Sequence, residues 1–149
     1  MITAVKCNPE QTVVKMLATL GIGFDCASKT EIEQVLSLGV DPSRIIYANP
    51  CKQQSFIRYS KKQNVKKMTF DNAEELYKIK ALFPDAELVL RILTDDSSSL
   101  CQLGLKFGAS LATTGKLLKL ARELDLNVIG VRYELMVVKA WQIFAFHVI

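Results

Sequence analysis

Short apolar segments with strand character alternate with longer amphipathic segments along almost all of this 149-residue chain. The apolar segments recur roughly every 20 to 25 residues, which is the spacing of a strand followed by a helix. They lie at residues 2–5, 22–24, 45–48, 68–70, 88–93 and 128–131. This alternation predicts consecutive βαβ units, and therefore an α/β fold built on a parallel sheet.

The predicted helices carry recognisable start signals. Pro9 is expected in the first turn of the first helix, where a missing N–H has no cost. Ser28 and Glu31 have the spacing of a capping box. Asp71 or Asn72 is expected to cap the helix that follows the fourth strand.

Composition excludes several classes of protein. Half of the residues are hydrophobic and the formal net charge is only +4, so we expect a packed core and no general binding to nucleic acid. Four scattered cysteines and a single histidine indicate neither a metal site nor a disulfide scaffold. No cleavable signal peptide opens the chain, which favours a cytoplasmic protein with free thiols.

Polar side chains follow or close several predicted strands, and they are the candidates for chemistry. Lys6 follows the first strand, Asp25 the second and Asp71 the fourth, and Arg91 closes the fifth. The carboxyl ends of parallel strands gather at one rim of a (β/α) barrel, so these groups are expected to face one cavity. A lysine desolvated at the end of a buried strand can lose its proton and form a Schiff base with an aldehyde cofactor. The alternatives are a lysine that reaches water and polar residues that only cap strands and helices.

Two segments break the alternating pattern. The polar segment 94–110 is predicted to be a binding loop, with a merely solvated loop as the alternative. Residues 132–149 are strongly apolar, but charges interrupt them too often for a bilayer span, which needs about 20 mostly apolar residues. We therefore expect no membrane anchor.

Several long sequence words resemble the eukaryotic ornithine decarboxylases, a family of pyridoxal 5′-phosphate (PLP)-dependent group IV decarboxylases that also includes the antizyme inhibitors. The matching words lie at residues 4–8, 23–31, 44–53, 90–92 and 94–96. The likeness covers nearly everything from Ile2 to Val131.

The resemblance implies a TIM barrel of the alanine-racemase type with an added β-domain. It also implies a homodimer that converts L-ornithine to putrescine and CO₂ in polyamine biosynthesis. Lys6 then corresponds to the lysine that forms the Schiff base with PLP, and Asp25 and Arg91 correspond to polar partners in the cofactor pocket. The cofactor withdraws the electrons released when the carboxylate leaves, while the protein orients the reacting groups.

The resemblance also implies a contact with the regulatory protein antizyme, in the region that matches residues 54–77. The basic candidates there are Arg58, Lys61, Lys62, Lys66 and Lys67. Positive charge suits an acidic partner, and a solvated helix face is the alternative. Antizyme inhibitors typically lack the acidic residue at the position of Asp25, so the chain resembles the active branch.

The chain also departs from the family pattern. About six of the eight barrel strands are expected, in a partial PLP-binding barrel domain at residues 1–131 without the β-domain, followed by a divergent apolar tail at 132–149. Tyr133 and Glu134 stand where the family has a histidine that stacks on the cofactor. These departures predict a truncated isoform that does not decarboxylate by itself. The alternatives are an antizyme-binding regulatory fragment and an aberrant splice product without function.

Overall fold

The computed structural model describes residues 1–94 and 107–133 of the chain, and this part forms a parallel sheet of six strands. The strands are β1 (Ile2–Ala4), β2 (Gly23–Cys26), β3 (Ile45–Tyr47), β4 (Lys67–Phe70), β5 (Glu87–Arg91) and β6 (Asn127–Arg132). They are neighbours in the order in which they occur along the chain, and every pairing is parallel. The predicted α/β fold with about six barrel strands is therefore confirmed.

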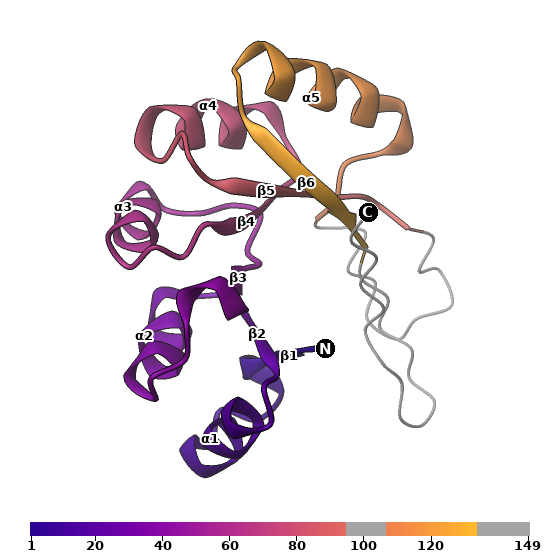
Figure 1. Cartoon of the computed structure of the whole chain (residues 1–149). Coiled ribbons are helices and arrows are strands. Elements are labelled where there is room, and N and C mark those ends of the chain that lie inside the picture. Colours follow the sequence, from indigo (N-terminus) through magenta and orange to yellow (C-terminus); the bar gives the residue numbers. More distant parts are fainter. Residues whose placement is uncertain (95–106, 134–149) are drawn as a thin grey trace.

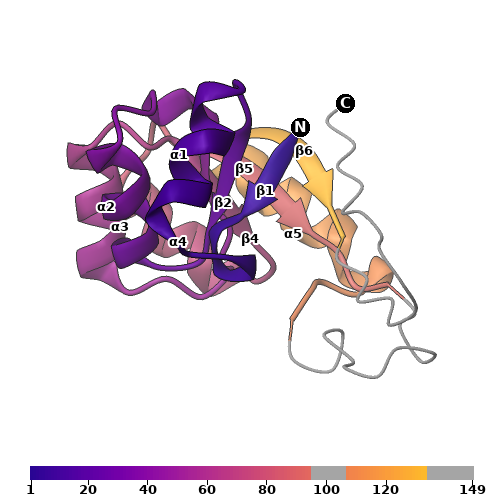
Figure 2. The ribbon, with the colours of Figure 1, turned by 90° about the horizontal axis from the view of Figure 1, so that it is seen from below.

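A helix covers the sheet after each of the first five strands. Within the described residues the helices are α1 (Gln11–Thr19), α2 (Lys29–Ser37), α3 (Gln54–Lys62), α4 (Ala73–Leu82) and α5 (Leu111–Glu123), and the short 3-10 turns are η1 (Val5–Cys7) and η2 (Pro42–Arg44). Figure 1 shows the strands as a curved succession with the helices on its outer side, and Figure 2 shows the same arrangement from below. In the described ranges, no helix is long and apolar enough to cross a membrane.

Side-chain caps begin two of these helices as predicted. The Ser28 hydroxyl accepts the N–H of Glu31 at 3.3 Å, and the Glu31 carboxylate accepts the N–H of Ala27 at 2.7 Å. The capping box thus forms, except that the Glu31 carboxylate bonds to Ala27 and not to the backbone N–H of the N-cap residue Ser28 itself. Asn72 caps α4 by accepting the N–H of Glu75 at 2.9 Å.

The start of α1 differs from the prediction. Pro9 was expected in the first turn, but the helix begins at Gln11. The carboxylate of Glu10 accepts the N–H of Val13 at 3.0 Å and so occupies the cap position. The proline therefore lies before the helix, and the acidic side chain after it satisfies the free N–H of Val13.

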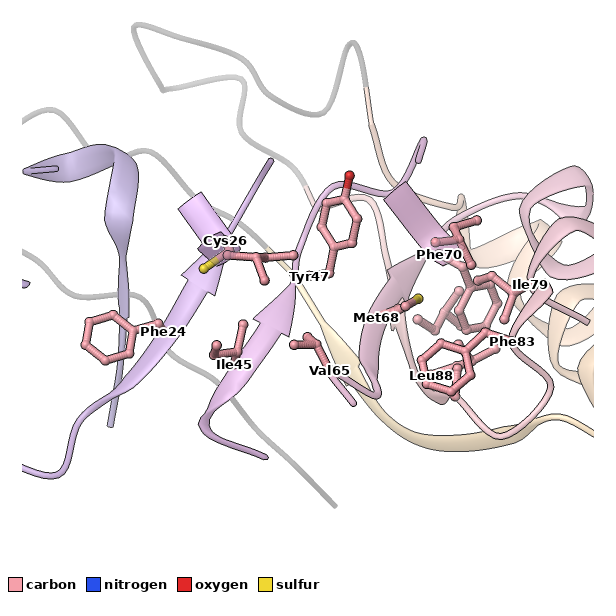
Figure 3. Packing of buried hydrophobic residues seen from close by; sticks show 14 of the residues in the cluster. Phe24, Cys26, Ile45, Tyr47, Val65, Met68, Phe70, Ile79, Phe83 and Leu88 are labelled. Atoms are coloured by element: carbon pink, nitrogen blue, oxygen red, sulfur yellow. The ribbon is translucent and has the colours of Figure 1, made fainter. Parts of the chain in front are cut away.

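The hydrophobic core lies between the sheet and the helices (Figure 3). Its strand residues are fully or almost fully buried and alternate along β2 to β5; they are Phe24, Cys26, Ile45, Tyr47, Met68, Phe70, Leu88 and Leu90. Because successive side chains of a strand point to opposite faces, Asp25, Thr69 and Arg91 are directed to the other, inner face of the curved sheet. The pleat therefore directs these polar groups, together with the apolar Ile46 and Val89, to the face opposite the helices.

Candidate functional site

A cavity of about 180 Å³ lies at the carboxyl ends of the strands. Its lining residues are Lys6, Asp25, Ala27, Ala48, Asn49, Pro50, Arg91 and Phe107. Three of the four residues predicted at the strand ends, Lys6, Asp25 and Arg91, thus share one cavity, and Asp71 does not line it. They come from the first, second and fifth strands and their connections, which are brought together only because the sheet is curved.

Lys6 is placed differently from the sequence expectation. Strand β1 ends at Ala4, and Lys6 is the middle residue of the 3-10 turn η1. Its side chain is exposed, so the expected desolvation at the end of a buried strand is wrong; the chain leaves the sheet two residues earlier. Among residues 1–94 and 107–133 the amine makes no hydrogen bond or ion pair. It is an accessible amine at the edge of the cavity.

Asp25 is buried and forms an ion pair across the inner face of the sheet. Its Oδ2 atom accepts a hydrogen bond from Nη2 of Arg132 at 2.5 Å, and the two side chains are 4% and 2% exposed. Sequence reasoning did not select Arg132, which it assigned to the tail that follows residue 131. The structure places Arg132 at the end of β6, as the register partner of Arg91. The strand-end rule that found Arg91 therefore applies to Arg132 as well.

Arg91 contacts the C-terminal end of the segment 94–110. Its guanidinium carbon lies 5.0 Å from the centre of the Phe107 ring, which is a cation–π geometry. The N–H of Ala109 donates to the Arg91 carbonyl at 2.9 Å, and the N–H of Gly108 donates to Asp71 Oδ2 at 2.9 Å. Asp71, predicted as a second carboxylate of the cavity, instead anchors this segment. Residues 95–106 lie outside the described part, so the binding-loop interpretation stays a prediction.

A buried ionic network supports the cavity wall that contains Asn49 and Pro50. The ammonium of Lys52 lies 2.9 Å from Glu75 Oε1 and donates to the carbonyls of Thr69 at 2.6 Å and Asn49 at 3.2 Å. Glu75 Oε2 also pairs with Lys78 at 2.6 Å. Burial lowers the pKa of Lys52, and the Glu75 carboxylate opposes that shift. This network could not be predicted from the sequence, because no local pattern shows that Lys52 points inward.

Cys26 offers no nucleophile to the cavity. Its side chain belongs to the helix-facing core, and burial, followed by the carboxylates of Glu31 and Asp25, raises the pKa of its thiol. A thiol in such surroundings stays protonated at neutral pH and is inert. Residues 1–94 and 107–133 also contain no group of three or more histidine, cysteine, aspartate or glutamate side chains placed to hold a metal ion.

The five basic antizyme candidates lie in two separate places. Arg58, Lys61 and Lys62 are exposed on α3. Lys66 and Lys67 instead line a depression of about 320 Å³ near the amino ends of the strands, beside Glu87, and the Lys67 ammonium donates to the Ser43 carbonyl at 2.7 Å. The structure therefore divides the basic stretch into a helix group of three and a strand-end group of two.

The chain matches the protein family described as "Pyridoxal-dependent decarboxylase, pyridoxal binding domain" over residues 1–135. It is 66% identical over 130 residues to ornithine decarboxylase of Neurospora crassa, covering 87% of this chain and 27% of that protein. It is 58% identical over 130 residues to antizyme inhibitor 2 of Xenopus laevis, covering 87% of this chain and 28% of that protein. The chain thus spans less than a third of the length of these curated relatives.

The fold is also similar to that of a decarboxylase of known structure. The arginine decarboxylase of Paramecium bursaria Chlorella virus, solved with bound agmatine, superposes with a TM-score of 0.87 at 41% sequence identity. The superposition covers 89% of this chain and 36% of the viral protein. The curved six-strand sheet is therefore an arrangement known from an experimentally determined decarboxylase.

Proposed function

The chain belongs to the pyridoxal-dependent decarboxylase family through its pyridoxal-binding domain, and from this premise we propose that it is the PLP-binding part of an ornithine decarboxylase-like protein. The proposed reaction of the whole protein is the conversion of L-ornithine to putrescine and CO₂. One observation carries the proposal: Lys6, Asp25 and Arg91 line the same cavity at the carboxyl ends of the strands. The high identity to a fungal ornithine decarboxylase supports the choice of substrate.

The groups that line the cavity fit PLP in chemical type. PLP carries an aldehyde and a phosphate and, when bound, supplies an electron sink for decarboxylation. Lys6 offers an accessible amine for the aldehyde, and the Arg91 guanidinium offers positive charge to an anionic group. Asp25 adds a buried carboxylate to the lining, paired with Arg132. The donor set is thus an amine, a carboxylate and a guanidinium around one space.

The small size of the cavity supports the proposal that these residues form only one side of a complete site. Its volume is about 180 Å³, whereas pockets that enclose a small molecule commonly measure about 300–1,000 Å³. We therefore propose that the 149-residue chain by itself does not turn over ornithine. Homodimer formation, implied by the family resemblance, and a cytoplasmic location, favoured by the four scattered cysteines, belong to the same proposal.

Covalent capture of PLP tests the proposal directly. The purified chain is mixed with PLP and reduced with borohydride, and the modified lysine is identified by peptide mass spectrometry. We expect modification at Lys6 and its loss in Lys6→Ala, because alanine has no amine. Lys15→Ala, which removes an exposed lysine on α1, is the matched control and should leave capture unchanged. Capture at many lysines alike, with none favoured at Lys6, would contradict the proposed site.

A second measurement addresses catalysis. Release of CO₂ from carboxyl-labelled ornithine is measured for the isolated chain and for Lys6→Ala. We expect no release above background from either protein. Release that disappears in Lys6→Ala would show an active isolated chain and would refute the proposed inactivity.

A second candidate function is binding to antizyme. It is favoured by the 58% identity to an antizyme inhibitor and by the exposed cations of α3. Charge reversal of Arg58, Lys61 and Lys62 should abolish capture on immobilised antizyme, whereas reversal of Lys66 alone should weaken it less. Equal capture by all variants would remove this mechanism. A chain that takes up neither PLP at Lys6 nor antizyme would behave as expected of an aberrant splice product.

A further inference from the structure

Asp71 links the connections that follow two neighbouring strands. It comes directly after β4, and its Oδ2 atom accepts the N–H of Gly108, 37 residues further along the chain, at 2.9 Å. Its Oδ1 atom accepts a hydrogen bond from the side-chain nitrogen of Asn72 at 2.9 Å, and Asn72 also caps α4. Both carboxylate oxygens of Asp71 are therefore engaged, and the start of a helix holds the group that anchors Gly108.

The chain at Gly108 lies directly against the end of β5. The N–H of Ala109 donates to the Arg91 carbonyl at 2.9 Å, and the Ala109 carbonyl accepts the N–H of Leu93 at 2.8 Å. Gly108 has a φ of +108°, and an added Cβ would lie 2.9 Å from the Leu93 nitrogen, so this approach needs a glycine. Phe107 directly precedes this point of the chain, which is fixed by the carboxylate anchor and by β5.

Phe107 carries the effect of this anchor into the cavity. The guanidinium carbon of Arg91 lies 5.0 Å from the centre of the Phe107 ring, and both side chains line the cavity. Arg91 is only 5% exposed. Cation–π attraction at this distance favours a placement of the guanidinium against the ring. The placement of a cation in the cavity wall therefore depends in part on a hydrogen bond to Asp71, a residue that does not line the cavity.

We propose that Asp71 is a positioning residue for the cofactor site: by holding Gly108 it keeps the Phe107 ring against Arg91 and so fixes the guanidinium in the cavity wall. A guanidinium that is already held in place loses less conformational freedom when it meets an anion. The anion in question is an anionic group of PLP, and this part of the inference rests on the proposed function. Asp71 acts only through Gly108 and Phe107, from outside the cavity.

The first measurement follows Arg91 without any cofactor. The full chain is treated with phenylglyoxal, which modifies accessible guanidinium groups, and mass spectrometry compares the Arg91 peptide with that of Arg122, which is exposed on α5. Asp71→Ala should speed modification of Arg91 relative to Arg122 by roughly three- to tenfold, because the ring is no longer held against the guanidinium. Asp71→Asn keeps an acceptor oxygen for the anchored N–H, so its rate should lie closer to the native rate than to that of Asp71→Ala. Asp85→Ala removes an exposed carboxylate before β5 and should change nothing.

A second variant tests the ring, and a second measurement tests the cofactor. Phe107→Leu removes the aromatic face but keeps apolar volume, so it should speed modification of Arg91 as Asp71→Ala does, and it serves alone if Asp71→Ala does not fold. The double variant should show no further increase, because both changes act through one contact. In borohydride capture of PLP at Lys6, the half-saturating PLP concentration should rise roughly three- to tenfold in both single variants. The fraction of Lys6 captured at saturation should stay the same, since the amine is unchanged.

Two results of the phenylglyoxal experiment would overturn the inference. One is an unchanged rate for Arg91 in Asp71→Ala, and the other is an additive increase in the double variant. Equal half-saturating concentrations of PLP in all variants would likewise remove the role of Asp71 in the cofactor site, while the proposed function stands. Because phenylglyoxal modification needs no PLP, the two proposals fail separately. A chain that takes up no PLP at Lys6 but shows the expected Arg91 pattern would refute the proposed function and leave the positioning of Arg91 by Asp71 standing.

Discussion

Replacement of Lys52 by methionine is expected to destabilise the fold although no surface feature changes. The Lys52 side chain is fully buried, and its ammonium contacts Glu75 at 2.9 Å, the Thr69 carbonyl at 2.6 Å and the Asn49 carbonyl at 3.2 Å. Methionine has a similar length but no charge or donor. The substitution therefore removes one partner of a buried ion pair and leaves the buried Thr69 carbonyl and the partly buried Asn49 carbonyl without this donor.

The expected loss in the free energy of unfolding depends on the partner that Glu75 keeps. Removing one partner of a buried pair commonly costs about 3–5 kcal/mol, because the other charge is left uncompensated. Here Glu75 keeps Lys78 at 2.6 Å, and that lysine side chain is only a quarter exposed. The residual pair reduces the penalty, so we expect Lys52→Met to lower the free energy of unfolding by about 2–4 kcal/mol.

Urea unfolding followed by far-ultraviolet circular dichroism measures this quantity. The midpoint should fall while the dependence on urea stays the same, since the surface exposed on unfolding is unchanged. Lys61→Met removes an exposed lysine of α3 and should stay within about 0.5 kcal/mol of the parent. Adding Glu75→Gln to Lys52→Met should recover part of the loss, because the buried carboxylate is then neutral. A loss below about 1 kcal/mol for Lys52→Met would refute the reasoning.

Two further predictions follow from the structure. Burial, followed by the carboxylates of Glu75 and Glu31, raises the pKa of Tyr47 from 10.0 to about 12. The buried neutral phenol therefore contributes fully to the free energy of unfolding below pH 10, and this contribution is lost as the pH rises towards 12. Urea unfolding on both sides of this pH window measures how much free energy of unfolding each protein loses. The loss should be about 2–3 kcal/mol smaller in Tyr47→Phe than in the parent, and equal losses would contradict the buried phenol. Gly108 has a φ of +108°, and an added Cβ would lie 2.9 Å from the Leu93 nitrogen. Gly108→Ala should therefore cost about 1–3 kcal/mol and speed hydrogen exchange of the Ala109 N–H, whereas unchanged exchange would exclude this close approach.

The fold could be predicted from local sequence patterns, because each strand signal or helix cap acts over only a few residues. The apolar segments predicted all six strands, and Ser28 with Glu31 and Asn72 predicted two helix starts that the structure confirms. The errors lie at the boundaries. Pro9 precedes α1, and β1 ends at Ala4 before the 3-10 turn that contains Lys6. Such ends depend on which side chain or neighbouring strand satisfies the last backbone groups.

The sequence by itself determined the alternation of strands and helices and the three strand-end residues Lys6, Asp25 and Arg91, because parallel strands place their carboxyl ends on one side. Only the tertiary structure decided how these groups are paired. Curvature of the sheet brings Arg132 to Asp25 across 107 residues, and the packing of α4 turns Lys52 inward to Glu75. The energy of a charge depends on its burial and on its nearest opposite charge, and both are properties of the folded chain rather than of any local segment.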